Sequence, residues 1–236
     1  MGLLPGLIVS CQAEPGSPFY GETFIRAFAE AAVLGGAVAV RLCGVNNVKA
    51  VRPHVAVPII ALTKSAYPDG RVLITESLAD VQALIQAGAD VIAVDATWRV
   101  RPQGITGTEF VRRIKQQWPH TLLVADVDTV EAGVAAAAAG ADYIATTLSG
   151  YTPATEHQSL DTPDLELIRQ LRQQVSRPVI AEGRIRTPAQ ARQAMEAGAY
   201  AVVVGSAITR PVEITRWFVT ALAPVGNSGM GSNWKP

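Results

Sequence analysis

A glycine–alanine pair recurs four times along the chain at nearly constant spacing, and this repeat limits the folds that the sequence can adopt. The pairs lie 52, 52 and 58 residues apart, each after a helix-like stretch and before an apolar run. Glycine suits the C′ position of a helix, where φ is positive, and alanine allows a tight entry into a strand. The repeat therefore predicts four two-unit modules, or eight βα units. The pairs are Gly36-Ala37, Gly88-Ala89, Gly140-Ala141 and Gly198-Ala199.

Eight short apolar runs alternate with these helix-like stretches. The runs are continuously apolar, which is typical of parallel strands that are buried on both faces. The predicted strands are 7–12, 37–43, 59–64, 91–97, 121–127, 143–148, 179–184 and 201–208. The clearest predicted helices are 109–118, 129–139, 163–174 and 187–197.

This order predicts an α/β fold, a single (β/α)8 TIM barrel over residues 1–222, followed by a flexible C-terminal tail at 223–236. An open doubly wound sheet is the alternative. The first strand is not followed by a G-x-G-x-x-G motif, which weakens that alternative. A polar loop at 149–162 is long enough for a lid or a binding loop.

Charge and composition exclude several classes of protein. The 20 Lys+Arg residues balance 20 Asp+Glu, so the basic excess of a nucleic-acid-binding protein is missing. No apolar run approaches the roughly 20 residues of a membrane span. The first basic residue is Arg26, whereas a secretory signal begins with positive charge. We therefore expect a cytoplasmic protein that acts on a small molecule and binds neither nucleic acid nor membrane, and a homo-oligomeric state stays open.

Most of the predicted strands end in polar side chains. Active sites of (β/α)8 barrels lie at the C-terminal ends of the strands, and polar groups buried there without partners would cost free energy. The sequence thus places a functional site at this end of the barrel. The polar residues at these ends are Gln12, Arg41, Lys64, Asp95, Asp126, Thr146, Thr147, Glu182, Arg184 and Ser206.

Lys64 is the most informative of these residues, because the chain has only four lysines. It follows the apolar run Ile59-Ile60-Ala61-Leu62 and Thr63. A lysine that is partly buried gives up its proton more readily and can act as a base or a nucleophile. The alternative is a structural ion pair with Glu182 or Asp126.

The last two predicted strands end in glycine-containing segments that predict a phosphate site. Gly183 and Arg184 lie at the end of predicted strand seven, and Gly205 and Ser206 lie near the end of predicted strand eight, where these barrels usually bind phosphate. Arg210 could add a charged contact, or it could simply be a solvated arginine at a helix start. Glu182 could likewise form a salt bridge with Arg184 at the barrel mouth.

The histidines and cysteines do not suggest a metal site or a thiol nucleophile. His54 and His120 precede strands, on the opposite end of the barrel, and His157 lies in the long loop. Cys11 lies inside strand one, and Cys43 has no histidine near it in the sequence. We expect no metal and no cofactor.

Several segments together resemble the N-acetylmannosamine-6-phosphate 2-epimerase family. The resemblance runs in order from Leu7 to about Leu222, and the longest segment is Thr146-Thr147-Leu148-Ser149-Gly150-Tyr151-Thr152. The others are Val9-Ser10-Cys11-Gln12-Ala13, Gly35-Gly36-Ala37, Lys64 before Tyr67-Pro68-Asp69, Asp95-Ala96-Thr97, Ala181-Glu182-Gly183-Arg184-Ile185 and Val204-Gly205-Ser206-Ala207-Ile208-Thr209-Arg210-Pro211.

This resemblance implies a reaction and roles for its residues. The family converts N-acetyl-D-mannosamine 6-phosphate to N-acetyl-D-glucosamine 6-phosphate in sialic acid breakdown, without metal or nucleotide. Lys64 would move the proton at C2, and Glu182 would position that lysine. The implied substrate-binding residues are Gln12, Arg41, Asp126 and Arg210, and the phosphate would bind at Gly183, Arg184, Gly205 and Ser206.

Three hypotheses about function stay open at this point. The first is a cofactor-independent epimerase of an N-acylhexosamine 6-phosphate, with Lys64 as base. The second is a Schiff-base aldolase or lyase, with Lys64 as nucleophile. The third is a sugar-phosphate binder without catalytic activity.

Overall fold

The computed structural model describes residues 2–159 and 161–223, and eight parallel strands form a closed barrel within them. Around the barrel the order is β1-β10-β9-β8-β7-β6-β3-β2. The strands are β1 (Gly6–Cys11), β2 (Ala39–Cys43), β3 (Ile59–Leu62), β6 (Val91–Asp95), β7 (Leu122–Asp126), β8 (Tyr143–Ala145), β9 (Val179–Glu182) and β10 (Ala201–Val204). The (β/α)8 barrel predicted from the repeat is confirmed. Residues 224–236 of the predicted tail lie outside the described residues.

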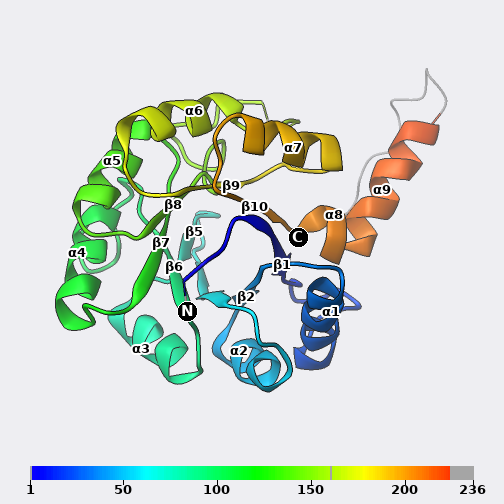
Figure 1. The fold of residues 1–236 in the computed structure, drawn as a ribbon, viewed down its shortest axis with the longest axis horizontal. Coiled ribbons are helices and arrows are strands. Elements are labelled where there is room, and N and C mark those ends of the chain that lie inside the picture. Colours follow the sequence, from blue (N-terminus) through cyan, green and yellow to red (C-terminus); the bar gives the residue numbers. More distant parts are fainter. Residues whose placement is uncertain (1, 160, 224–236) are drawn as a thin grey trace.

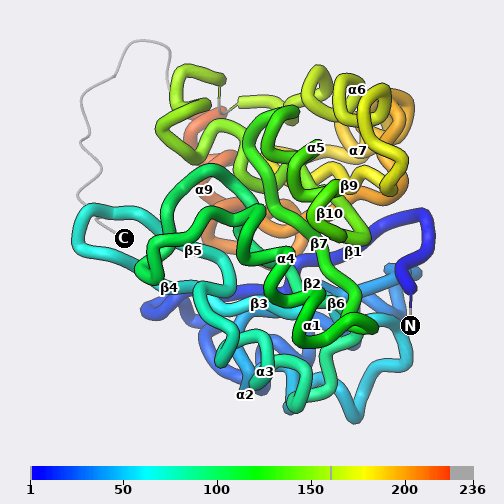
Figure 2. The backbone as a smooth tube through the Cα atoms, turned by 90° about the vertical axis from the view of Figure 1, so that its left-hand side faces the viewer, coloured from blue at the N-terminus to red at the C-terminus, as the bar shows by residue number. Residues whose placement is uncertain are grey.

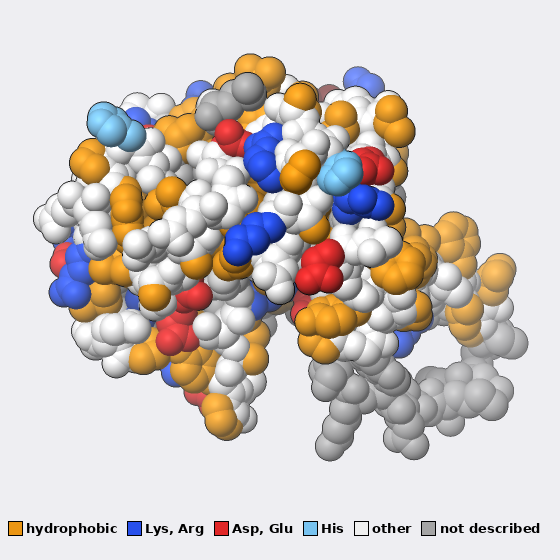
Figure 3. Space-filling view, turned by 90° about the horizontal axis from the view of Figure 1, so that it is seen from below, with side chains coloured by type: hydrophobic (Ala, Val, Ile, Leu, Met, Phe, Trp, Pro, Cys, Tyr) orange, Lys and Arg blue, Asp and Glu red, His pale blue; other side chains and the backbone are white. Residues whose placement is uncertain are grey.

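Helices surround the barrel in a ring, and the last helix projects away from it (Figure 1). The helices are α1 (Glu22–Leu34), α2 (Val45–Val51) with the 3-10 turn η1 (Arg52–His54), α3 (Leu78–Gln86), α4 (Gly107–Gln117), α5 (Val130–Ala138), α6 (Leu165–Gln174), α7 (Pro188–Glu196), α8 (Ser206–Thr209) and α9 (Pro211–Leu222). Among the described residues, no helix is both long and apolar enough to cross a membrane. On the face in Figure 3, basic and acidic side chains are interspersed among apolar ones.

The glycines of the repeat take the backbone conformation that the sequence predicts. Gly36, Gly88, Gly140 and Gly198 have φ angles of 93°, 94°, 107° and 104°. Each directly follows the last turn of a helix and turns the chain toward the next strand. The repeat thus marks the ends of α1, α3, α5 and α7.

The core has two layers, and strand periodicity separates them. Alternate residues point inward, where Ile8, Ile60, Val124 and Ile180 form one cluster, while the other residues pack against the helices. Two residues further along their strands, Val124 is followed by Asp126 and Ile180 by Glu182. The inward rows therefore end in charged groups at the C-terminal end of the barrel.

Except for strand two, the predicted strands end one to four residues beyond the observed ends, and two of these differences bear on the site. Predicted strand three (59–64) ends at Leu62, and Lys64 instead begins the antiparallel hairpin β4 (Lys64–Ala66) and β5 (Val72–Ile74). Figure 2 shows this hairpin at the end of the barrel opposite the N-terminus. Predicted strand eight (201–208) ends at Val204, because Gly205, with φ −111° and ψ −85°, leaves the extended conformation and α8 begins.

Gly107, the first residue of α4, allows the helix to start against the loop after β6. A Cβ at this position would lie 2.4 Å from Ala96 Cα and 2.7 Å from Thr97 O. We predict that G107A lowers the free energy of unfolding by about 2–3 kcal/mol, because the rigid backbone must shift. Urea unfolding measures this, with G35A as the control, since a Cβ at Gly35 meets nothing closer than 3.4 Å. Equal losses in the two variants would contradict the prediction.

Candidate active site

A cavity of about 470 Å³ opens at the C-terminal end of the barrel. Ten residues were predicted to act in catalysis, substrate binding or phosphate binding. Nine of them line this cavity: Gln12, Arg41, Lys64, Glu182, Gly183, Arg184, Gly205, Ser206 and Arg210. Asp126, the tenth, is not among the lining residues. Its side chain is fully buried beside Arg41. The structure thus brings together residues from β1, β2, β9, β10, the β4–β5 hairpin and the segment that joins α8 to α9.

At the floor of the cavity, Arg41 is held by two carboxylates. Its Nη2 lies 2.7 Å from Asp126 Oδ2 and its Nη1 3.2 Å from Asp126 Oδ1, so the pair is bidentate. Nη1 also lies 3.1 Å from Glu182 Oε2. The side chains of Arg41 and Asp126 are 2% and 0% exposed, so this charge is compensated within the barrel and not by solvent.

Burial also governs the acidity of this cluster. Desolvation raises the pKa of Glu182 to about 7, the negative charge of Asp126 adds to the increase, and Arg41 opposes it. Desolvation raises the pKa of Asp126 as well, against the opposing effect of Arg41. Because Asp126 has the bidentate contact with Arg41, Glu182 is the carboxyl group that we expect to gain or lose a proton near neutral pH.

Lys64 forms its ion pair with a residue that the sequence analysis did not single out. Its Nζ lies 2.9 Å from Glu14 Oε1, and Arg210 Nη2 lies 3.1 Å from the same oxygen. Burial tends to raise the pKa of Glu14, but Lys64 and Arg210 together lower it. The ion pairs considered from sequence, of Lys64 with Glu182 or Asp126, are not among the ion pairs of the described residues.

The hairpin that carries Lys64 is anchored to the barrel by Thr75. Its backbone N–H donates to Thr63 O (2.9 Å), and its hydroxyl accepts from Thr63 N (3.2 Å) and donates to Ala93 O on β6 (2.7 Å). Thr75 has a φ of 49°, which is uncommon for a residue other than glycine. Thr75 thereby links Thr63, the residue before Lys64, to β6 of the barrel.

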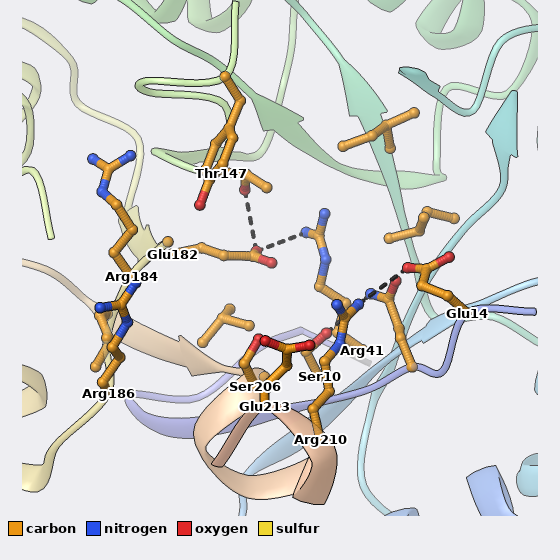
Figure 4. A pocket seen from close by; sticks show the side chains of 18 of the residues that line it. Ser10, Glu14, Arg41, Thr147, Glu182, Arg184, Arg186, Ser206, Arg210 and Glu213 are labelled. Carbon is orange, nitrogen blue, oxygen red and sulfur yellow. Dashed lines mark hydrogen bonds and ion pairs between the residues drawn. The ribbon is translucent and has the colours of Figure 1, made fainter. Parts of the chain in front are cut away.

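The predicted phosphate-binding residues extend from Arg184, across the cavity from Glu14, to Ser206, which lies between them beside Ser10 and Glu213 (Figure 4). Figure 4 shows Arg184 and Arg186 on one side and Glu14 on the other. Gly183 has a φ of 111°, and a Cβ on Gly205 would lie 3.3 Å from Ser10 Cβ, so the chain passes close to β1 here. Ser206 begins the short helix α8.

Arg184 is bound to both ends of the 149–162 loop. Its Nε donates to Thr162 O at 2.7 Å, and its Nη1 donates to Ser149 O. The guanidinium lies 5.6 Å from the centre of the Tyr151 ring. These contacts, and not the salt bridge with Glu182 that the sequence left as an alternative, hold the Arg184 side chain. They also fix the loop beside the cavity.

Several lining residues had no role assigned from sequence. Ser10 lies between Ile8 and the predicted substrate-binding residue Gln12 in the inward row, and Glu14 is the next residue in that alternation, although β1 ends at Cys11. Thr147 lies within the longest of the motifs, but its contacts with β7 and β9 could not be read from it. The other polar or aromatic ones are Tyr151, Arg186, Glu213 and Trp217, of which Arg186 lies over the Trp217 ring.

Neither a metal-binding cluster nor an acidic thiol is found among the described residues. Within the described part of the chain, no three His, Cys, Asp or Glu residues form a group that could hold a metal ion. Cys11 is buried in β1, and its burial raises the pKa of the thiol to about 12.

Comparisons with known proteins point to a family. The family described as "Putative N-acetylmannosamine-6-phosphate epimerase" matches residues 25–224. The chain belongs to this family. A relative from Caldanaerobacter subterraneus, named "Putative N-acetylmannosamine-6-phosphate 2-epimerase", is 49% identical over 215 residues, which are 91% of this chain and 90% of the relative. A Salmonella typhimurium relative, whose name differs only by a final "1", is 49% identical over 219 residues, 92% of both chains.

A solved structure supports the same assignment. The N-acetylmannosamine-6-phosphate 2-epimerase from Clostridium perfringens is 40% identical to this chain. It superposes with a TM-score of 0.85, over 92% of this chain and 93% of that one. The family resemblance stated from the sequence motifs is thereby confirmed.

The raised pKa of Glu182 predicts a pH-dependent effect of E182Q on stability. The pKa is about 7 in the folded protein and roughly 4.3 in an unfolded chain. Between these values the folded state binds more protons, so the contribution of Glu182 is fully present below about pH 4 and is lost as pH rises to 7. Glutamine cannot ionise. The unfolding free energy of E182Q relative to the wild type should therefore rise between pH 5 and pH 8.

Urea unfolding at several pH values tests this, with E131Q, an exposed position on α5, as the matched control. E131Q should run parallel to the wild type. If E182Q also ran parallel to the wild type from pH 5 to pH 8, the raised pKa of Glu182 would be refuted.

Proposed function

We propose that the chain interconverts N-acetyl-D-mannosamine 6-phosphate and N-acetyl-D-glucosamine 6-phosphate by removing and returning the proton at C2, without a metal or an organic cofactor. The observation that carries this proposal is the position of Lys64. It shares one cavity with a buried guanidinium–carboxylate cluster and with the glycine-containing segments after β9 and β10. The family and its named relatives support the choice of substrate.

Epimerisation at C2 needs a base for a weakly acidic C–H bond next to the C1 carbonyl of the opened sugar. In the proposed step the ammonium group of Lys64 first loses a proton to solvent, and the neutral amine then takes the C2 proton. The electron pair of the C–H bond forms a C1=C2 double bond, and the π pair of the C1 carbonyl moves onto its oxygen. The same proton, or one exchanged with water, then returns to the other face of C2. Glu14, 2.9 Å from Lys64 Nζ, orients the amine and stabilises the ammonium ion that forms.

The oxyanion that develops at C1 needs preorganised hydrogen-bond donors. Gln12 and Arg41 are proposed for this role, since both line the cavity. Asp126 holds the Arg41 guanidinium in place from beneath the cavity. Glu182, whose burial raises its pKa to about 7, can keep a proton at neutral pH and so adds no negative charge beside the developing oxyanion. In this proposal Glu182 acts beside Arg41, and Glu14 positions Lys64.

The phosphate is proposed to bind at Gly183, Arg184, Gly205 and Ser206, with Arg210 adding positive charge. Binding energy at the phosphate anchors the open sugar while its other end reacts. Because Arg184 also holds the 149–162 loop, phosphate binding would stabilise that loop. A charged sugar phosphate does not cross a membrane unaided, so we also propose a cytoplasmic location. The oligomeric state stays a prediction.

The role of Lys64 is tested by K64R. Arginine keeps the positive charge beside Glu14 but cannot be deprotonated at neutral pH. We predict that kcat for N-acetylmannosamine 6-phosphate falls by about 1,000-fold or more, since a general base contributes factors of this order. The matched control is K49R on the exposed face of α2, which should keep wild-type turnover. Addition of EDTA should leave the wild-type rate unchanged. A K64R enzyme with more than a tenth of the wild-type kcat would overturn the proposed mechanism.

A further inference from the structure

The hydroxyl group of Thr147 lies between the two carboxyl groups of the cluster. Its Oγ1 is 2.6 Å from Asp126 Oδ1 and 3.1 Å from Glu182 Oε2 (Figure 4 shows the second contact). Thr147 follows β8, whose neighbours in the barrel are β7 and β9, so the side chain reaches the ends of both. A single hydroxyl thus links residues 126 and 182, which come from two different strands.

The hydrogen atoms at this position can be counted. A threonine hydroxyl has one hydrogen to donate and two lone pairs, and an ionised carboxylate can only accept. One hydrogen cannot form a good hydrogen bond with both Asp126 and Glu182. The shorter contact assigns it to Asp126, which stays ionised because it also receives two N–H groups of Arg41. The contact with Glu182 is then a hydrogen bond only when Glu182 carries a proton.

The surrounding charges favour the same arrangement. Arg41 on β2 faces both carboxyl groups, so the three groups are neutral in total when one carboxyl group is protonated. Asp95 on β6 adds negative charge near Asp126, Lys64 on the hairpin adds positive charge near Glu182, and Cys43 lies near Arg41. The side chain of Glu182 is 13% exposed, which leaves it open to the cavity.

The neighbouring threonine fixes the backbone of Glu182 at the same point. The Thr146 hydroxyl donates to Glu182 O at 3.0 Å and accepts from Glu182 N at 3.1 Å. The main chain of Glu182 is thus held by Thr146, which leaves Thr147 to act on the carboxyl group alone. Because different residues contact the main chain and the carboxyl group of Glu182, a substitution of Thr147 tests the carboxyl contact without removing the main-chain contact.

We propose that Thr147 is a positioning residue that keeps the proton on Glu182, by donating its own hydrogen to Asp126 and accepting the hydrogen of the Glu182 carboxyl group. The chain of hydrogen bonds runs from Glu182 through Thr147 to Asp126, and it ends on the carboxylate that holds Arg41. This arrangement fixes which oxygen of Glu182 bears the proton and turns the other oxygen away from Thr147. Its effect on the reaction rests on the proposed function, whereas its effect on the titration of Glu182 does not.

The test is the titration of Glu182 in T147V, T147A and T147S. Valine has the shape of threonine without the hydroxyl, alanine avoids any strain from the second methyl group, and serine keeps the hydroxyl. Carbon-13 NMR of protein labelled at the glutamate carboxyl carbon follows the titration, and the resonance of Glu182 is assigned by its loss in E182Q. T23V, on the exposed face of α1, is the matched control.

We expect the pKa of Glu182 to fall by about half to one unit in T147V and T147A, because a hydrogen bond that forms only with the protonated carboxyl group is lost. T147S and T23V should leave the pKa of Glu182 within about 0.2 of the wild-type value, which is a small fraction of the decrease expected for T147V and T147A. The limb of the kcat/KM profile near pH 7 should move in the same direction. An unchanged or raised pKa in folded T147V or T147A would overturn the proposal. The NMR titration of Glu182 does not depend on turnover. Failure of the proposed function would therefore appear in the activity assay and not in this titration.

Discussion

The positive charge of Arg41 inside the barrel is the constraint on which the rest of the site depends. A buried guanidinium is tolerated only when anions compensate it with good geometry. Asp126 provides two short contacts and Glu182 a third, from β7 and β9, which lie across the barrel from Arg41 on β2. Because two carboxyl groups share one cation, one of them is poised to hold a proton. The packing that encloses Arg41 therefore also determines the acidity of Glu182.

The cavity contains a second, more exposed group of charges that is separate from the first. Lys64 and Arg210 share Glu14, and the three side chains are 31%, 34% and 53% exposed. Such exposed pairs contribute little to stability, which leaves their side chains free to rearrange around a ligand. The buried cluster supplies fixed donors for a developing negative charge, and the exposed group supplies a mobile amine. This division suits a reaction in which a proton moves and an oxyanion must be held still.

Much of this arrangement could be predicted from the sequence, because it depends on local patterns. The glycines of the repeat mark helix ends, and the apolar runs mark strands, so residues such as Arg41 and Glu182 fall at the ends of strands. The β4–β5 hairpin was not predicted, although Pro68-Asp69-Gly70 is a typical turn sequence. Glu14 and Thr147 acquire their roles only through contacts with residues far along the chain. Charge pairing across a barrel mouth depends on which side chains reach one another, and the sequence does not specify that.

The incorporation of deuterium at C2 reports directly on proton transfer by Lys64. The wild-type protein is incubated with N-acetylmannosamine 6-phosphate in heavy water, and the product is analysed by proton NMR and mass spectrometry. If Lys64 takes the C2 proton and exchanges it with solvent, the N-acetylglucosamine 6-phosphate carries one deuterium, at C2. Complete retention of the original hydrogen during many turnovers, or deuterium at another carbon, would exclude this proton transfer.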